Sequence, residues 1–246
     1  MTRRSTLLLC GGVAFLIALI ATLPASLIAG RIGPRLALGG AYGTIWSGGA
    51  DQVTLDGAPL GAIEWTAHPL ALLRAQLAYH VVLTHPAGHL SGDVAVGPGG
   101  TIDASGVEFS LPINALSAIK RADSWQGAVS GRVDRALVEN GWPSALSANL
   151  TLSGLRPPGA AFELGSYALE LDPLASKPDT IVGRIKDVSA PLTVRAQLEV
   201  KRDRSYLIEG EVTPKPGTPP TIASQLAFLG PADQLGRHSF SVTGTF

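Results

Sequence analysis

The side chains best suited to chemistry are three closely spaced histidines, His80, His85 and His89. A metal site built from histidines usually needs ligands on alternate strand residues or an i, i+4 pair on a helix, with further ligands completing the set. Here the histidines bracket a strand-like run and a Pro-Gly turn, and no carboxylate follows before Asp93. The spacing therefore favours histidines at a surface or a sheet edge over a metal site.

Motifs for covalent catalysis and for nucleotide binding are absent from the sequence. It contains no G-x-S-x-G elbow, no G-x-x-x-x-G-K-[ST] loop and no G-x-G-x-x-G followed by a helix. The glycine-rich run GPGG at 97–100 has no lysine beside it to meet a phosphate, so we expect a turn there. The carboxylates do not pair at a spacing that implies a shared site. We therefore expect a protein that is not an enzyme and that carries no metal or cofactor.

The composition narrows the class of protein further. Basic and acidic residues number 19 each, so the formal net charge is zero and no basic surface for nucleic acid is indicated. Cys10 is the only cysteine, which excludes an intramolecular disulfide and a cysteine-based metal cluster. With 29 glycines, 18 prolines and 15% charged residues, the chain has the turn-rich composition of many short strands.

An apolar run near the N-terminus is the strongest local signal. Residues 5–30 contain no charged side chain, and a membrane-spanning helix needs ~20 apolar residues. Two arginines precede the run, and the positive-inside tendency keeps that end in the cytoplasm. We therefore predict a cytoplasmic N-terminus at 1–6, a transmembrane signal-anchor helix at 7–29 and an exported body at 30–246.

A cleavable signal peptide is the alternative interpretation of this run. Small residues lie between Ala21 and Ala25, and Pro24 is of the kind found before cleavage sites. However, the apolar core at 7–23 is longer than the ~7–15 residues that are usual in signal peptides. The uncleaved anchor is favoured, and cleavage stays open.

Beyond the apolar run, apolar and polar residues alternate. In the run TVRAQLEV at 193–200 the apolar residues would share one face of a strand and the polar residues the other. Turn-like runs at 85–89, 97–100 and 201–205 join such strands, at the spacing of an antiparallel meander. The pattern predicts one mainly β domain, a largely antiparallel sheet with a single apolar face.

Three short segments depart from this alternation. They carry apolar residues at helical spacing next to proline or glycine and lie at 68–77, 114–122 and 221–230. Isolated helices of this length are marginal in water, so we expect them to pack onto the sheet. They would cover its apolar face or close its ends, which relieves the cost of open edges.

Glycines flank two of the four tryptophans. Trp46 lies between Gly43 and Gly48 in GTIWSGGA, and Trp125 is followed two residues later by Gly127. Glycine at the opening of a strand lets another backbone or an indole ring approach closely. We therefore expect Trp46 and Trp125 to plug the core of the sheet, where truncation of a fully buried Trp46 to alanine would cost ~3–5 kcal/mol.

An ordered set of motifs resembles the type II secretion system protein N family, also called general secretion pathway protein N. The set consists of the N-terminal anchor, G-T-[IVL]-W-x-G, an element W-x-x-x-P-x-x-L-L, a central W-x-G and a later W-P turn. The matching residues are Gly43, Trp46, Gly48, Trp65, Pro69, Leu72, Leu73, Trp125, Gly127, Trp142 and Pro143.

The resemblance implies a single-pass inner-membrane protein whose residues 30–246 form a periplasmic β domain. It further implies a non-enzymatic subunit or assembly factor of the type II secretion system, which moves folded proteins across the outer membrane, with other secretion-system subunits as partners. No catalytic residue is carried over. The pattern is also similar to AsmA-like and TamB-like periplasmic proteins, whose curved sheets form an apolar trough, although a fold does not fix a function.

The expected apolar face leaves two alternatives to the structural subunit. A sheet with few helices to cover it exposes apolar surface, which usually marks a site for a partner or a lipid, and its free edges allow strand addition by another chain. A periplasmic domain that binds or transfers phospholipid is therefore one alternative. An outer-membrane barrel, suggested by the alternating strand that ends at Phe246, is the other, and it is disfavoured by the prolines and the 6% aromatic content.

Overall fold

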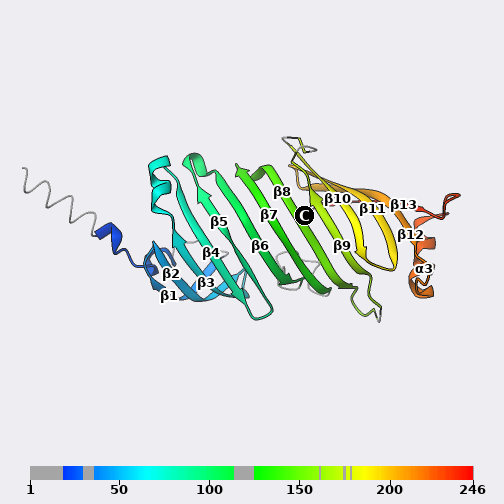
Figure 1. The fold of residues 1–246 in the computed structure, drawn as a ribbon, viewed down its shortest axis with the longest axis horizontal. Helices are drawn as coiled ribbons and strands as arrows, with labels where there is room; N and C mark the ends of the chain where they lie inside the picture. The colour runs from blue at the N-terminus through cyan, green and yellow to red at the C-terminus, as the bar shows by residue number, and fades with distance from the viewer. Residues whose placement is uncertain are drawn as a thin grey trace, which may run out of the picture.

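The protein is built on one long sheet (Figure 1). The structure is a computed structural model that describes residues 19–29, 36–113, 125–160, 162–173, 176–177 and 179–245. The sheet has 13 strands, and their order across the sheet is their order along the chain. All neighbouring strands run antiparallel. The predicted antiparallel meander is therefore confirmed.

The strands lengthen from the N-terminal end toward the middle of the sheet. They are β1 Leu36–Gly43, β2 Ser47–Leu55, β3 Ala58–Ala67, β4 Leu77–His85, β5 Gly88–Val96, β6 Ile102–Pro112, β7 Gln126–Glu139, β8 Trp142–Arg156, β9 Gly165–Leu171, β10 Thr180–Ser189, β11 Leu192–Lys201, β12 Ser205–Pro214 and β13 His238–Thr245. The helical elements are α2 Ser26–Ala29, η1 Pro69–Arg74, η2 Pro98–Gly100, α3 Pro220–Leu226 and η4 Ala227–Leu229, where η denotes a 3₁₀ helix.

Alternation along each strand sorts the side chains onto two faces. Val194 of β11 lies opposite Val212 of β12, and Leu198 lies opposite Ile208, all on one face. The same face continues across β10, because the register places Ile185 opposite Ala196. One face of the sheet is therefore apolar from strand to strand, as the alternation in the sequence predicts.

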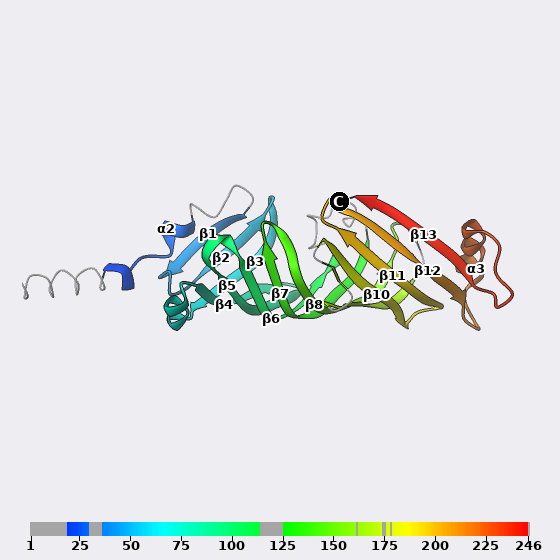
Figure 2. The same ribbon diagram turned by 90° about the horizontal axis from the view of Figure 1, so that it is seen from above.

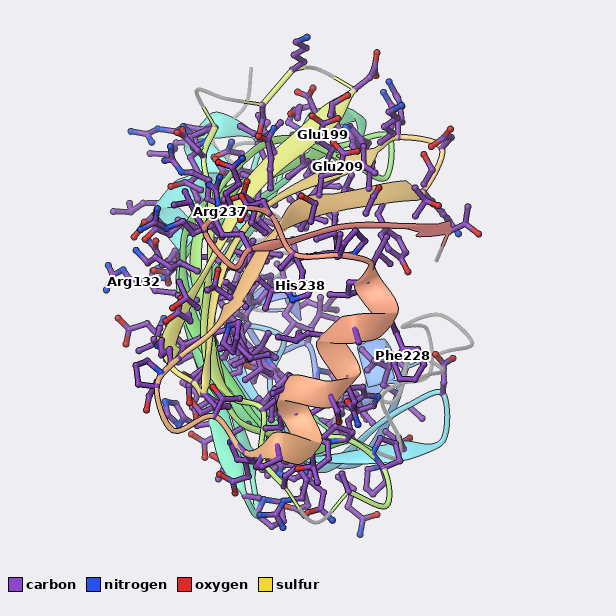
Figure 3. All side chains as sticks on the ribbon, turned by 90° about the vertical axis from the view of Figure 1, so that its right-hand side faces the viewer. Arg132, Glu199, Glu209, Phe228, Arg237 and His238 are labelled. Atoms are coloured by element: carbon purple, nitrogen blue, oxygen red, sulfur yellow. The ribbon has the colours of Figure 1, made fainter. Side chains whose placement is uncertain are left out.

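The opposite face is polar and carries ion pairs between neighbouring strands. Arg135 donates to Asp103 at 2.8 Å, Lys186 pairs with Glu170, and Arg132 pairs with Glu108. Figure 3 looks along the long axis and shows the sheet as a curved wall, with Arg132 pointing outward. Exposed pairs of this kind contribute little to stability each, but they favour the register in which opposite charges face one another.

Tight turns set the register of the hairpins. Asp56 and Gly57 join β2 to β3, and Asn140 and Gly141 join β7 to β8, with all four residues at positive φ between 51° and 85°. Two-residue loops with positive φ match the twist of antiparallel strands and favour Asn-Gly and Asp-Gly. At the predicted turn 201–205, the Ser205 amide donates to Asp203 Oδ1 at 2.9 Å. The turns predicted at 85–89 and 97–100 also join neighbouring strands.

The C-terminal end of the apolar face is covered by a helix. Ile222 and Leu226 of α3 are buried against Leu192 and Val212 of the sheet. Figures 2 and 3 place α3 at the far end of the sheet from α2, on the inner side of its curve. The helix predicted at 221–230 is thus confirmed, together with its packing onto the sheet.

The other two predicted helices have different outcomes. The segment 68–77 forms a 3₁₀ helix that spans only Pro69–Arg74, and none of its residues is buried. Leu70 and Leu73 are exposed, so of the two expected roles the segment does not cover the apolar face, and it lies instead toward the N-terminal end of the sheet (Figure 1). The segment 114–122 lies outside the described residues.

The predicted transmembrane helix at 7–29 lies mainly outside the described residues, which begin at Leu19. In the part of the chain that the structure describes, no helix combines the length and the apolar character needed to cross a membrane. The described part of this segment is a helical turn that reaches Ala21, a break, and the four-residue α2.

Burial is shallow because the fold is a single layer. No large side chain among the described residues is fully buried. All four tryptophans lie in this part of the chain, and only Trp142 is buried, with 9% of its surface exposed. Trp46, Trp65 and Trp125 are half-buried.

Trp142→Ala is expected to lower the free energy of unfolding by ~3–5 kcal/mol, because a large buried side chain is removed from a thin core. Urea unfolding followed by circular dichroism measures the change. Phe228→Ala is the control, since Phe228 is 90% exposed, and it should change stability by less than ~0.5 kcal/mol. Equal effects of the two substitutions would contradict the assignment of Trp142 to the core.

Candidate functional site

The first hairpin binds the segment that precedes the sheet. The Ala25 amide donates to the Gly43 carbonyl at 3.1 Å, and the Ile45 amide donates to the Leu23 carbonyl at 3.0 Å. Pro24 lies opposite Thr44 as an isolated antiparallel bridge. Residues 23–25 therefore pair with residues 43–45 through an isolated bridge. We call this pairing, together with Trp46 and Trp65, the N-terminal clasp.

Two indole rings fix the clasp. Trp46 Nε1 donates to the Ile20 carbonyl at 2.9 Å, and Trp65 Nε1, from β3, donates to the Thr44 carbonyl at 3.1 Å. One ring thus binds the N-terminal segment to the loop, and the other binds the loop to the sheet. Trp46 is therefore a connector between two parts of the chain.

Glycine is required on both sides of this tryptophan. Gly43 has φ +77°, and a Cβ added to it would lie 2.6 Å from the Ser47 carbonyl oxygen. A Cβ on Gly48 would lie 2.4 Å from the Tyr42 carbonyl oxygen and 3.0 Å from the Trp65 ring. Glycine therefore permits the close approach of strand and indole that the motif suggested.

The turn η1 lies beside the clasp. Trp46, Leu72 and Leu77 line the same small hollow, so the second family element meets the first in space. Pro69 begins the turn and Ala75 ends it in the left-handed conformation, at φ 55°. Leu70 and Leu73 point away from the hollow's lining, and their side chains are exposed.

A carboxylate between two histidines holds the base of this turn. Asp93 Oδ1 lies 2.9 Å from His80 Nδ1 and 3.4 Å from His68 Nε2. The hydrogen bond with His80, followed by that with His68, holds the pKa of Asp93 below its ordinary value. His68 immediately precedes η1, so the contact joins the turn to β4 and β5.

The predicted histidine cluster is divided in the structure. His80 faces Asp93, whereas His85 is the last residue of β4 and accepts a hydrogen bond from the Ala87 amide at 3.0 Å. His89 lies opposite Thr84, across the turn after β4. Within the described ranges, no three of the side chains His, Cys, Asp and Glu are grouped to hold a metal ion.

The remaining family-motif residues lie away from the clasp, on the central hairpin. Trp125 and Gly127 are at the start of β7, while Trp142 and Pro143 begin β8, at the opposite end of the β7–β8 pair. Gly127 has φ +137°, and a Cβ there would lie 2.8 Å from the Ser153 carbonyl oxygen. Gly43, Trp46, Gly48, Trp65, Pro69 and Leu72 are therefore brought together, and this second group is not.

Sequence reasoning missed the partners of the clasp. Ile20 and Thr44 accept the two indole hydrogen bonds through their backbone carbonyls, and any residue type can supply a carbonyl. His68 and Asp93 are separated by 25 residues, so local spacing does not reveal them. The alternation of β4 and β5 placed His80 and Asp93 on the polar face, and their direct opposition follows only from the register.

The apolar face between the two ends forms a continuous trough. Leu83 lies opposite Leu90, which lies opposite Phe109, and Leu150 lies opposite Leu169. These side chains are half-buried, except Leu83, which is buried. We call the apolar face of β3–β12 the trough; its surface is suited to apolar ligands or partners.

An ion pair closes the trough at its C-terminal end. Lys215 Nζ lies 2.6 Å from Asp187 Oδ2, and the Val194 amide donates to Asp187 Oδ1 at 2.9 Å. Burial alone would raise the pKa of Asp187, but these hydrogen bonds and the lysine charge hold that pKa below its ordinary value. The pair joins β10 to the segment that leads into α3.

A second hollow lies on the polar face, near β12. Glu199, Glu209 and Glu211 are among the residues that line it, and Glu211 is paired with Arg237 at 2.9 Å. Glu199 lies in β11 and Glu209 in β12, at the same end of the sheet as α3 (Figure 1). The hollow is wide and open, so it lacks the enclosed apolar walls of a small-molecule site.

Trp46→Phe should loosen the N-terminal segment without unfolding the sheet. The ring volume is largely kept, but the hydrogen bond to Ile20 is lost, and such a bond contributes ~0.5–1.5 kcal/mol. Hydrogen exchange at the Leu23 and Ala25 amides should therefore accelerate by roughly 2- to 10-fold. Trp125→Phe is the matched control and should leave exchange in this segment unchanged; equal acceleration in both variants would contradict the clasp.

Asp187→Asn should destabilise the protein in a pH-dependent manner. Since the folded pKa of Asp187 is lowered, its charge stabilises the fold above the ordinary carboxyl pKa, and this contribution is lost as the pH falls through the lowered value. The expected loss at neutral pH is about 1 kcal/mol, because Lys215 is partly solvated. Urea unfolding at neutral and strongly acidic pH should show the two proteins converging in acid; a constant difference would contradict the role of the charge.

The sequence matches known proteins over nearly its whole length. The family model described as Type II secretion system (T2SS), protein N matches residues 34–241. A protein of Aeromonas hydrophila named Type II secretion system protein N is 28% identical over 244 residues, covering 94% of each chain. A protein of Vibrio cholerae serotype O1 with the same name is 28% identical over 255 residues, covering 98% of this chain and 95% of the relative. No solved structure gives a significant match. Because the family model matches residues 34–241, which is well over half of the chain, the chain belongs to the type II secretion system protein N family.

Proposed function

We propose that this protein is a non-enzymatic subunit or assembly factor of the type II secretion system, anchored in the inner membrane and placed in the periplasm. Residues 1–6 would lie in the cytoplasm, 7–29 would span the membrane and 30–246 would form the periplasmic domain. The full-length relationship to proteins named for this secretion system is the observation that carries the proposal.

The clasp supports a tethered sheet. The charge-free run of residues 5–30 itself contains Ile20, Leu23 and Ala25, whose backbone groups bind the loop of the first hairpin. A body held this way follows the position of its anchor. Such coupling suits a subunit that must keep a defined place beside an inner-membrane assembly.

The trough supports a contact role for the body. Apolar side chains remain half-exposed along many strands, and their burial by a partner would lower the free energy of the complex. Strand β13 is the last of an open sheet, so its outer edge offers a second mode of docking by strand addition. Other subunits of the secretion system are the partners that family membership favours.

Phospholipid is the second candidate occupant of the trough. The favouring observation is its apolar continuity, from Leu83 across Leu90 to Phe109 and on through Leu150 and Leu169. An acyl chain would gain from burial there in the same way as an apolar protein surface. The protein would then bind or transfer lipid in the periplasm.

Site-specific photocrosslinking in cells that secrete by this system separates the two occupants. A photoreactive residue at Leu150 faces the trough, whereas one at Asn149 faces the polar side one residue away. We expect a protein adduct containing a secretion-system subunit at position 150 and none at 149. A phospholipid adduct at 150 alone would favour the lipid function, and equal labelling at both positions would contradict a role for the trough.

Loss of the protein should reduce export of folded substrates, which would accumulate in the periplasm. Complementation with the wild-type chain should restore export, and Leu150→Asp should restore it less well than Asn149→Asp, since only the former places a charge in the trough. Assays of secreted enzyme in medium and periplasm measure this. Full rescue by both variants would contradict the proposed contact surface.

A further inference from the structure

The turn η1 presents apolar side chains to solvent instead of to the sheet. Leu70 is 78% exposed and Leu73 is 86% exposed. In a 3₁₀ helix, residues i and i+3 lie above one another, so these two leucines share one outward face. Leu72 lies on another side of the turn and lines the hollow beside Trp46. The turn therefore has an inner face that packs against the clasp and an outer face formed by two leucines.

The turn is held rigidly in this position. The His68 amide donates to the Ala78 carbonyl at 2.8 Å, and the Gln76 amide donates to the Ala71 carbonyl at 3.1 Å. The contact of His68 with Asp93 joins its base to β5. Exposed apolar residues on a mobile loop would be able to fold back, whereas these are fixed in an outward direction.

The turn lies where the N-terminal segment leaves the sheet. Its cyan coil in Figure 1 and the blue segment that begins at Leu19 are at the same end of the molecule, and Figure 2 agrees. Trp46 links the two, because it bonds to Ile20 and lines the hollow with Leu72. Leu19 and Ile20 are also about half exposed. Exposed apolar side chains therefore lie both on η1 and on the segment that Trp46 binds.

The charge of the turn fits a lipid surface. Its first turn has no acidic residue, and its last turn carries Arg74. An arginine beside buried leucines can extend to the headgroup phosphates while the leucines enter the acyl boundary.

We propose that Leu70 and Leu73 insert into the periplasmic surface of the membrane that holds the anchor, giving the sheet a second point of attachment. This inference rests on the proposed anchoring of residues 7–29. A single span leaves the attached body free to tilt and rotate, whereas span and turn together restrict its orientation. The long axis of the trough is then directed away from the bilayer, because the turn lies at one end of the sheet.

Fluorescence quenching on the full-length chain in phospholipid vesicles tests this insertion. Cys10→Ser removes the only native cysteine, and single cysteines then carry an environment-sensitive dye at Leu19, Leu73 or Phe228. Phe228 is the matched control, since it is as exposed as Leu73 but lies at the α3 end of the sheet. Lipids that carry a quencher along the acyl chain should quench the dye at Leu19, lipids that carry one near the headgroup should quench the dye at Leu73, and both should leave the dye at Phe228 bright.

The outcomes separate the inference from the proposed function. If the dye at Leu19 is quenched and the dye at Leu73 behaves like that at Phe228, the anchor holds and the inserted turn is wrong. If neither Leu19 nor Leu73 is quenched, the anchoring itself fails. A third outcome is that the dye at Leu73 is shielded from an aqueous quencher, is not quenched by the lipid quencher, and becomes more shielded as the protein concentration rises. In that case a second copy of the chain covers the turn, and the inference is overturned.

A second series keeps the native leucines during labelling. A cysteine that replaces Arg74 carries the dye. Quenching by the lipid quencher is compared between the protein with both native leucines and the double variant Leu70→Ser, Leu73→Ser. Both leucines are exposed, so the double variant should fold normally. We expect it to lose most of the lipid quenching at position 74, and unchanged quenching would overturn the role of the leucines.

Discussion

A single layer of strands has no second layer to cover its apolar face, so the apolar side chains are shielded only by the side chains beside them. In a sandwich, a second sheet about 10 Å away would complete the core, but here the 13 strands form one open sheet. Side chains such as Leu150 and Leu169 therefore stay half-exposed even though their register is regular. The shallow core, the short helices and the contact surfaces that we propose all follow from this missing second layer.

The two ends of the sheet meet this constraint in different ways. At the C-terminal end, α3 buries Ile222 and Leu226 against the apolar face, and the ion pair of Asp187 with Lys215 fixes the segment that leads into the helix. At the N-terminal end, the clasp satisfies backbone groups of the first hairpin, while η1 leaves its leucines outside. One end thus resembles a closed core, and the other is incomplete in isolation.

The fold was largely predictable because it follows from the alternation of apolar and polar residues and from short turns, both of which are local in the sequence. Alternation such as that at 193–200 fixes which side chains share a face, and short polar turns fix antiparallel neighbours. Asp56-Gly57 and Asn140-Gly141 are further hairpin signals in the sequence that would have placed β2–β3 and β7–β8 directly. The helix expected at 68–77 became a 3₁₀ turn in which Leu70 and Leu73 are exposed, while Leu72 lies beside Trp46. Helical spacing predicts a shared apolar face but does not say which neighbour covers it.

The candidate site was less predictable, since its contacts join distant residues. The glycines around Trp46 indicated close approach, yet its partner, the Ile20 carbonyl, lies 26 residues earlier and has no side-chain signature. Trp46 donates a hydrogen bond to the backbone of the N-terminal segment and is only half-buried. The expectation of a fully buried core tryptophan therefore overstates its contribution to stability. Its position instead couples two parts of the chain. The motif residues that converge on this junction set the direction in which the N-terminal segment leaves the first hairpin, because Trp46 and Trp65 bind the Ile20 and Thr44 carbonyls.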